Sequence, residues 1–166
     1  MTGDRLPITV AIPTYRRERV LIETLEYLLD LSPPPAEILV LDQTERHETS
    51  TDQRLAHWNE LGVIRWYRLD RPSITGSMNQ GLLQAANEVV LFVDDDVRPE
   101  PELLKAHLAE HERLGNALVA GRVIQPWQEG VDFASDPDNK FAGTRSRQVD
   151  EFIGCNFSVK RSAALL

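Results

Sequence analysis

The chain has 166 residues, of which 42% are hydrophobic and 27% are charged, values typical of one soluble globular domain. Its formal net charge of −8 argues against nucleic acid as the main partner, because phosphates would be repelled. A single cysteine, Cys155, excludes an intrachain disulfide and indicates a reducing, cytoplasmic compartment.

Short β-branched apolar runs alternate with amphipathic segments along the chain, which predicts alternating strands and helices. Prolines and glycines stand at several of the boundaries. We expect strands at residues 8–12, 38–41, 63–69, 88–93, 117–124 and 152–159, helices at 17–31, 52–61, 73–86 and 101–114, and a mobile loop at 130–147. The alternation predicts a single α/β domain over residues 1–166, with a Rossmann-like, mostly parallel sheet flanked by helices.

Three consecutive aspartates, Asp94, Asp95 and Asp96, follow the strand expected at 88–93. Two carboxylates about 5 Å apart repel by roughly 3 kcal/mol at an effective dielectric near 20. A hard divalent cation, Mn²⁺ or Mg²⁺, that also binds phosphate oxygens would offset this repulsion. The alternative is a solvated acidic turn that caps the next helix.

Polar residues also follow the first two expected strands. Pro13, Thr14 and Tyr15 end the first strand, and Asp42 ends the second. Because the carboxyl ends of parallel strands share one edge, we expect these residues and the aspartates to face one crevice. Neither a G-x-G-x-x-G turn nor a Walker A loop is present. A bound nucleotide would therefore depend on contacts to its base and ribose, with a metal on its phosphates.

Four segments resemble, in order, those of the inverting family 2 glycosyltransferases, which have the GT-A fold. They are residues 12–17 (IPTYRR), 39–44 (LVLDQT), 76–81 leading into 90–96 (VLFVDDD), and 154–161 (GCNFSVKR). The resemblance implies a GT-A-like fold and a nucleotide-sugar donor, with a UDP-sugar as the default. It implies a D-x-D motif in which Asp96 is the main metal ligand and Asp94 assists. The donor-nucleotide residues that it implies are Pro13, Thr14, Tyr15, Asp42, Asn79, Asp94 and Asp95.

Two features differ from the family pattern. Met78 stands where many relatives carry a basic residue, and we expect it to pack in the core. The general base of the family comes from an acidic motif well after the Gly154–Cys155–Asn156 segment, and this chain ends at Leu166. We therefore expect the base beyond Leu166, a chain incomplete at its C-terminus, and donor binding with little or no sugar transfer.

The partners are only partly defined by the sequence. The acceptor is expected to be a glycan, a lipid carrier, a protein or a small molecule, and the oligomeric state stays open. No apolar run approaches the roughly 20 residues that span a bilayer, and residues 1–7 lack a signal-peptide pattern. Peripheral attachment to the inner face of a membrane remains compatible with the sequence.

Two other functions have some support in the sequence. His107, Glu110 and His111 match the H-x-x-E-H pattern of inverzincin zinc hydrolases, although both histidines could instead border an amphipathic helix face. A non-catalytic nucleotide- or sugar-binding module is favoured by the missing base. A nucleotidyltransferase would require a glycine-rich, basic phosphate loop near Ile12, which is not there.

Three other charged or titratable side chains carry weaker signals. Arg16 and Arg17 either approach a diphosphate or lie exposed at the start of a helix, and we expect His47 at the surface.

Overall fold

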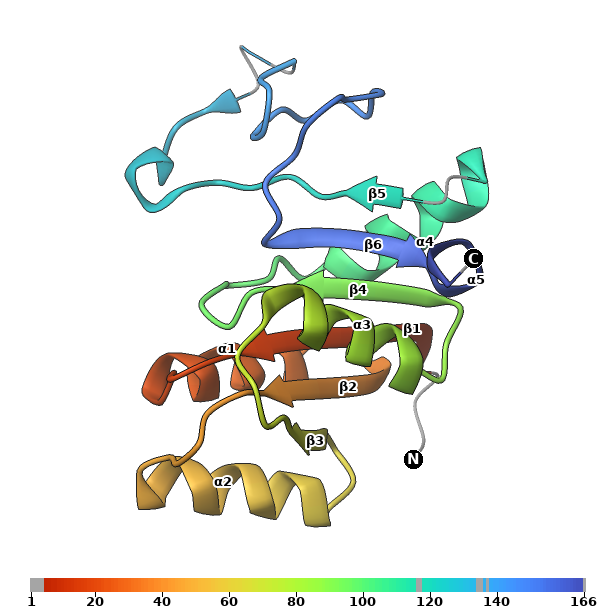
Figure 1. Cartoon of the computed structure of the whole chain (residues 1–166). Helices are drawn as coiled ribbons and strands as arrows, with labels where there is room; N and C mark the ends of the chain where they lie inside the picture. The colour runs from red at the N-terminus through yellow and green to blue at the C-terminus, as the bar shows by residue number, and fades with distance from the viewer. Residues whose placement is uncertain (1–4, 116–117, 134–135, 137, 166) are drawn as a thin grey trace.

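The computed structural model describes residues 5–115, 118–133, 136 and 138–165. Six strands form one sheet in the order β3-β2-β1-β4-β6-β5 (Figure 1). The strands are β1 (Leu6–Thr14), β2 (Pro35–Asp42), β3 (Arg65–Arg68), β4 (Val89–Val93), β5 (Leu118–Ala120) and β6 (Asn156–Lys160). β1 pairs in parallel with both β2 and β4, and β2 pairs in parallel with β3. The predicted α/β fold with a mostly parallel sheet is confirmed.

The C-terminal edge of the sheet departs from simple strand–helix alternation. β6 lies between β4 and β5 and runs antiparallel to both. Between β5 and β6 the chain makes no crossover helix in its described part, only an irregular segment with one 3₁₀ turn, η1 (Pro126–Gln128). A parallel return needs a crossover connection, so without one the chain comes back in the opposite direction. The strand expected at 117–124 is correspondingly short, and its residue 117 lies outside the described residues.

Helices cover both faces of the sheet. They are α1 (Arg19–Leu29), α2 (Thr49–Glu60), α3 (Ile74–Gln84), α4 (Leu103–Leu114) and the short α5 (Arg161–Ala164). α3 lies in front of the sheet in Figure 1, and α1 and α4 lie behind it. The four long helices agree with their predicted positions to within three residues. Among the described residues, none of the helices is both long and apolar enough to cross a bilayer.

Alternate residues of β4 supply the two cores, as the period of a strand requires. Leu91 and Val93 join the larger core beneath α1 and α4, whereas Val90 and Phe92 face α3. The α3 core also takes Met78 as a partly buried residue, which confirms its predicted packing role. α3 approaches closely because Gly81 has no side chain: a Cβ there would lie 3.2 Å from the Phe92 ring.

Candidate functional site

A cleft of about 440 Å³ opens at the carboxyl ends of β1 and β4. Its walls come from the ends of β1 and β4, from the residue after β2, and from the start of α3. The lining residues are Pro13, Thr14, Tyr15, Arg17, Gln43, Pro72, Ser73, Ile74, Asp94, Asp95 and Asp96. The structure therefore brings together six residues of the expected site, those at 13–15 and 94–96. Asp42 and Asn79 are not among the lining residues.

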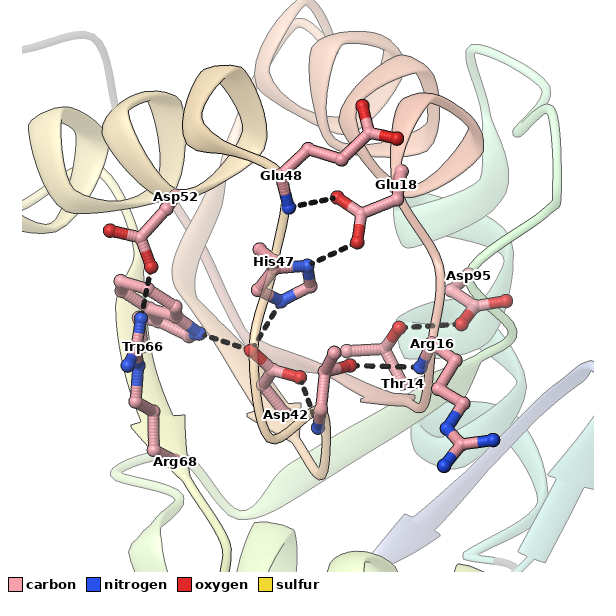
Figure 2. Close-up of polar contacts among 11 residues, drawn as sticks. Thr14, Arg16, Glu18, Asp42, His47, Glu48, Asp52, Trp66, Arg68 and Asp95 are labelled. Carbon is pink, nitrogen blue, oxygen red and sulfur yellow. Dashed lines mark hydrogen bonds and ion pairs between the residues drawn. The ribbon is translucent and has the colours of Figure 1, made fainter.

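Asp95 is the buried member of the three aspartates. Its carboxylate accepts a hydrogen bond of 2.6 Å from the Thr14 hydroxyl (Figure 2). Its main-chain carbonyl accepts one of 3.0 Å from the Thr24 hydroxyl. Burial raises the pKa of Asp95, and the Thr14 hydrogen bond and the nearby Arg17 charge act against that rise. Asp95 thus ties the tip of β4 to β1 and α1.

Asp94 and Asp96 have freer carboxylates. Asp94 is half-buried and Asp96 is exposed. The pKa of Asp94 is raised first by burial and then by the negative charges of Asp96 and Asp95. The Asp94 amide donates to the Cys155 carbonyl over 3.3 Å, so the segment before β6 abuts this tip. The acidic tip, defined here as residues 94–96, concentrates negative charge at the cleft wall.

Arg17 reaches the acidic tip from the turn between β1 and α1. Its Nε lies 3.3 Å from Asp95 Oδ1, and its Nη2 lies 3.5 Å from Asp96 Oδ2. The Arg17 side chain is 48% exposed. The sequence left two positions open for Arg17, an exposed helix start or a place near a diphosphate. The structure places Arg17 in the cleft wall.

The acidic tip fits a divalent cation of the Mg²⁺ type. Within the described ranges, no three or more His, Cys, Asp or Glu side chains are grouped so as to hold a metal by themselves. Mg²⁺ and similar cations, however, are commonly held by one or two carboxylates, with substrate phosphates and water completing the shell. Asp94 and Asp96, both in the cleft wall, supply such a pair.

Asp42 lies behind the cleft wall, with none of its surface exposed. Its Oδ1 accepts from the Thr44 amide at 2.8 Å. Its Oδ2 accepts from Trp66 Nε1 at 2.9 Å and lies 2.7 Å from His47 Nε2 (Figure 2). Because both oxygens are occupied by protein groups, Asp42 organises the loop after β2 and is not presented to the cleft.

His47 is buried, and the expectation of a surface position was wrong. Its Nδ1 lies 3.1 Å from Glu18 Oε1, while Nε2 faces Asp42 (Figure 2). The ring therefore bridges the start of α1 and the loop after β2. It is tolerated inside because both of its ring nitrogens have polar partners.

Gln43 is a cleft residue that the sequence interpretation did not single out. Its amide oxygen accepts a hydrogen bond from the Ser73 amide, so its NH₂ group is the part that a ligand can meet. Beside it, Thr44 Oγ1 accepts from the Arg16 amide at 2.8 Å and holds the turn where Arg16 has φ of 56°. The position of Gln43 directly after Asp42, the last residue of β2, was the sequence signal that could have identified Gln43 as a cleft residue. Asn79 is exposed on α3.

Comparison with known proteins identifies the family. The chain matches the profile described as glycosyl transferase family 2 over residues 9–164. The chain belongs to this family. No curated protein matches it in sequence.

Several solved structures share the fold of this family 2 domain. Mannosyltransferase PcManGT from Pyrobaculum calidifontis, solved with GDP-Man and Mn²⁺, has a TM-score of 0.67 and 19% identity over 96% of this chain and 46% of that one. S. aureus TarS 1–349 with UDP-GlcNAc has a TM-score of 0.57 and 25% identity over 70% of this chain and 34% of that one. A second structure of S. aureus TarS 1–349 has a TM-score of 0.63 and 19% identity over 93% of this chain and 47% of that one. The likeness confirms the GT-A-like fold, and the chain spans less than half the length of each protein.

The H-x-x-E-H residues of this family 2 domain serve packing between α4 and β6. His107 and His111 are buried, and both rings contact the Ser158 hydroxyl, at 2.7 and 2.8 Å. Glu110 instead pairs with Arg113 and accepts from Ser146. Both histidines lie on the covered face of α4, where β6 packs against them. The zinc-hydrolase alternative finds no support, since both histidines contact Ser158 while Glu110 pairs with Arg113, and the described residues include no group of three such side chains that could hold a metal.

Proposed function

We propose that this domain binds the nucleotide-sugar donor of an inverting glycosyltransferase. The observation that carries the proposal is the cleft itself. It is lined by polar and aromatic groups of β1 and by Gln43 together with three carboxylates, in a chain of the glycosyl transferase family 2. Its volume of about 440 Å³ is within the usual range for small-molecule sites.

The nucleotide would lie along the wall formed by β1 and Gln43. Tyr15 is 40% exposed and offers a ring face for the base, and Pro13 and Thr14 shape the floor beneath it. The free NH₂ group of Gln43 can donate to a carbonyl on the base edge, which both uracil and guanine possess. Asp42 acts as a positioning residue through Thr44 and His47. Asn79, which is exposed on α3, would contact the nucleotide at the edge of the site.

The diphosphate would lie against the acidic tip, with Mn²⁺ or Mg²⁺ held by Asp96 and Asp94. When bound, such a cation supplies Lewis-acid stabilisation of the departing diphosphate. Asp95, fixed by the Thr14 hydroxyl, holds the other two carboxylates at the wall. The acceptor hydroxyl, of a glycan, a lipid carrier or a small molecule, would attack from the opposite face of the sugar. The free Cys155 is compatible with a cytoplasmic location for this reaction.

Calorimetric titration tests the proposal. The chain is titrated with UDP, GDP and dTDP, each with and without Mn²⁺, beside Asp96→Ala and the control Asp30→Ala. Asp30 is exposed at the end of α1, outside the cleft lining. We expect metal-dependent binding of at least one nucleotide, weakened about tenfold or more by Asp96→Ala and unchanged by Asp30→Ala. Binding to no nucleotide, or binding indifferent to both Mn²⁺ and Asp96, would contradict the proposal.

A further inference from the structure

Arg17 is a cation that already occupies the acidic tip. We propose that Arg17 is the resident counter-cation of this tip, and that it releases Asp96 when a nucleoside diphosphate arrives with its divalent cation. The cation then enters together with the diphosphate and does not precede it. This inference rests on the proposed donor function and adds the order and coupling of binding.

The turn between β1 and α1 selects Arg17 for this position. Arg16 has a left-handed backbone, φ 56°, and its amide is held by Thr44 Oγ1. Its guanidinium lies over the Tyr15 ring at 5.0 Å and has no ion pair with a carboxylate among the described residues. In Figure 2 the Arg16 side chain extends away from Asp95. Two adjacent arginines therefore differ sharply: only Arg17 contacts the acidic tip.

The two contacts of Arg17 are unequal. The Asp95 side chain is only 10% exposed and is held from its other oxygen by Thr14. The Asp96 side chain is 47% exposed and meets Arg17 over the longer distance of 3.5 Å. Solvent screens an exposed pair much more than a buried one. Arg17 can therefore give up Asp96 and remain anchored at Asp95.

Release of Asp96 would change what each group can bind. A divalent cation between Asp94 and Asp96 would stand beside the Arg17 charge, and the two positive charges repel. A diphosphate relieves this repulsion because its oxygens can bind the metal and accept from the freed guanidinium N–H groups. Metal and nucleotide should then each strengthen the binding of the other by the same factor.

The test measures Mn²⁺ binding to the full chain by electron paramagnetic resonance, with and without UDP or GDP. Variants are Arg17→Gln and the matched control Arg16→Gln, which removes the same charge from the adjacent residue. We expect Arg17→Gln to bind Mn²⁺ alone about three- to tenfold more tightly than the wild type. The gain in Mn²⁺ affinity on adding nucleotide should shrink by a similar factor. Arg16→Gln should stay within about twofold for both quantities.

A second measurement follows the Arg17 side chain itself. The ¹⁵N resonances of its Nη groups, one of which faces Asp96, are recorded with Mg²⁺ alone and then with Mg²⁺ and UDP or GDP together. We expect a clear shift only when both are present, because only then does the guanidinium exchange Asp96 for phosphate oxygens.

The proposal fails if Arg17→Gln binds Mn²⁺ alone no more tightly than Arg16→Gln, or if neither variant nor the wild type binds Mn²⁺ at millimolar concentration. It also fails if Mg²⁺ alone moves the Nη resonances as far as Mg²⁺ with nucleotide. Failure of the donor function looks different. In that case no nucleotide binds the wild type, while Arg17→Gln still tightens Mn²⁺ binding and so supports the counter-cation role.

Discussion

Two buried histidine clusters of this protein have opposite surroundings. His47 lies between two carboxylates, Glu18 and Asp42, beside the cleft. His107 and His111 lie on α4 and share the hydroxyl of Ser158 on β6. All three rings are almost fully buried, so burial alone does not distinguish them. Their partners do, because a carboxylate accepts hydrogen bonds whereas a hydroxyl can both donate and accept.

The protons of the α4–β6 cluster can be placed from its partners. The Asn156 side-chain oxygen can only accept, so His107 Nε2, 2.9 Å away, carries a proton. The Asn156 nitrogen donates to the Arg122 carbonyl, which supports this orientation of the amide. Burial lowers the pKa of His107 to about 4, so its Nδ1 is unprotonated and accepts from Ser158. Ser158 in turn accepts from His111 Nε2, which makes a directional chain of hydrogen bonds.

Loss of His47 should have the largest effect. His47→Ala removes a hydrogen-bond partner from both the fully buried Asp42 carboxylate and Glu18, which at about 2 kcal/mol for each carboxylate should cost about 4 kcal/mol. Urea denaturation should show this loss in the free energy of unfolding. The control His57→Ala, on the exposed side of α2, should change it by less than about 0.5 kcal/mol. Equal losses for the two variants would refute the bridging role of His47.

The α4–β6 cluster should make stability depend on pH. The folded-state pKa of His107 is about 4, below its ordinary 6.5, so the unfolded chain binds this proton first as pH falls. Stability should therefore be complete above pH 6.5 and fall by about 3 kcal/mol toward pH 4. The raised pKa values of Asp94 and Asp95 act in the opposite direction, since their contribution is lost as pH rises through those values.

A variant isolates the histidine contribution to that profile. His107→Gln removes the titrating group and can keep a hydrogen bond to the neighbouring strand. The free energies of unfolding of the wild type and His107→Gln are measured from pH 7 to pH 4. The wild-type value should fall relative to the variant value by about 3 kcal/mol over this range. Parallel profiles for the two proteins would show that His107 is not the group responsible.

Removal of the shared hydroxyl should have the smallest of these effects. Ser158→Ala deprives two histidine nitrogens of their partner and should cost about 2 kcal/mol. Thermal and urea unfolding measure the loss. Ser50→Ala, an exposed serine in the first turn of α2, provides the control and should be close to neutral. A Ser158→Ala protein as stable as this control would show that water replaces the hydroxyl.

Features with a local physical cause were predictable from the sequence. Apolar periodicity located the four long helices and the parallel strands, because the faces they bury repeat along the chain. The carboxyl ends of β1 and β4 were recognised as parts of one site because parallel strands end at a common edge. Residues 13–15 and 94–96 do line one cleft.

Features that join distant segments were decided only by the tertiary structure. Thr14 and Asp95 are 81 residues apart, and Glu18 and His47 are 29 apart. No local pattern encodes these pairs, so the sequence alone placed His47 at the surface. The same holds for β6, whose alternating residues predict a strand but not its place between β4 and β5. Periodicity determines which residues are buried, whereas strand order and the pairing of charges depend on which segments meet in space.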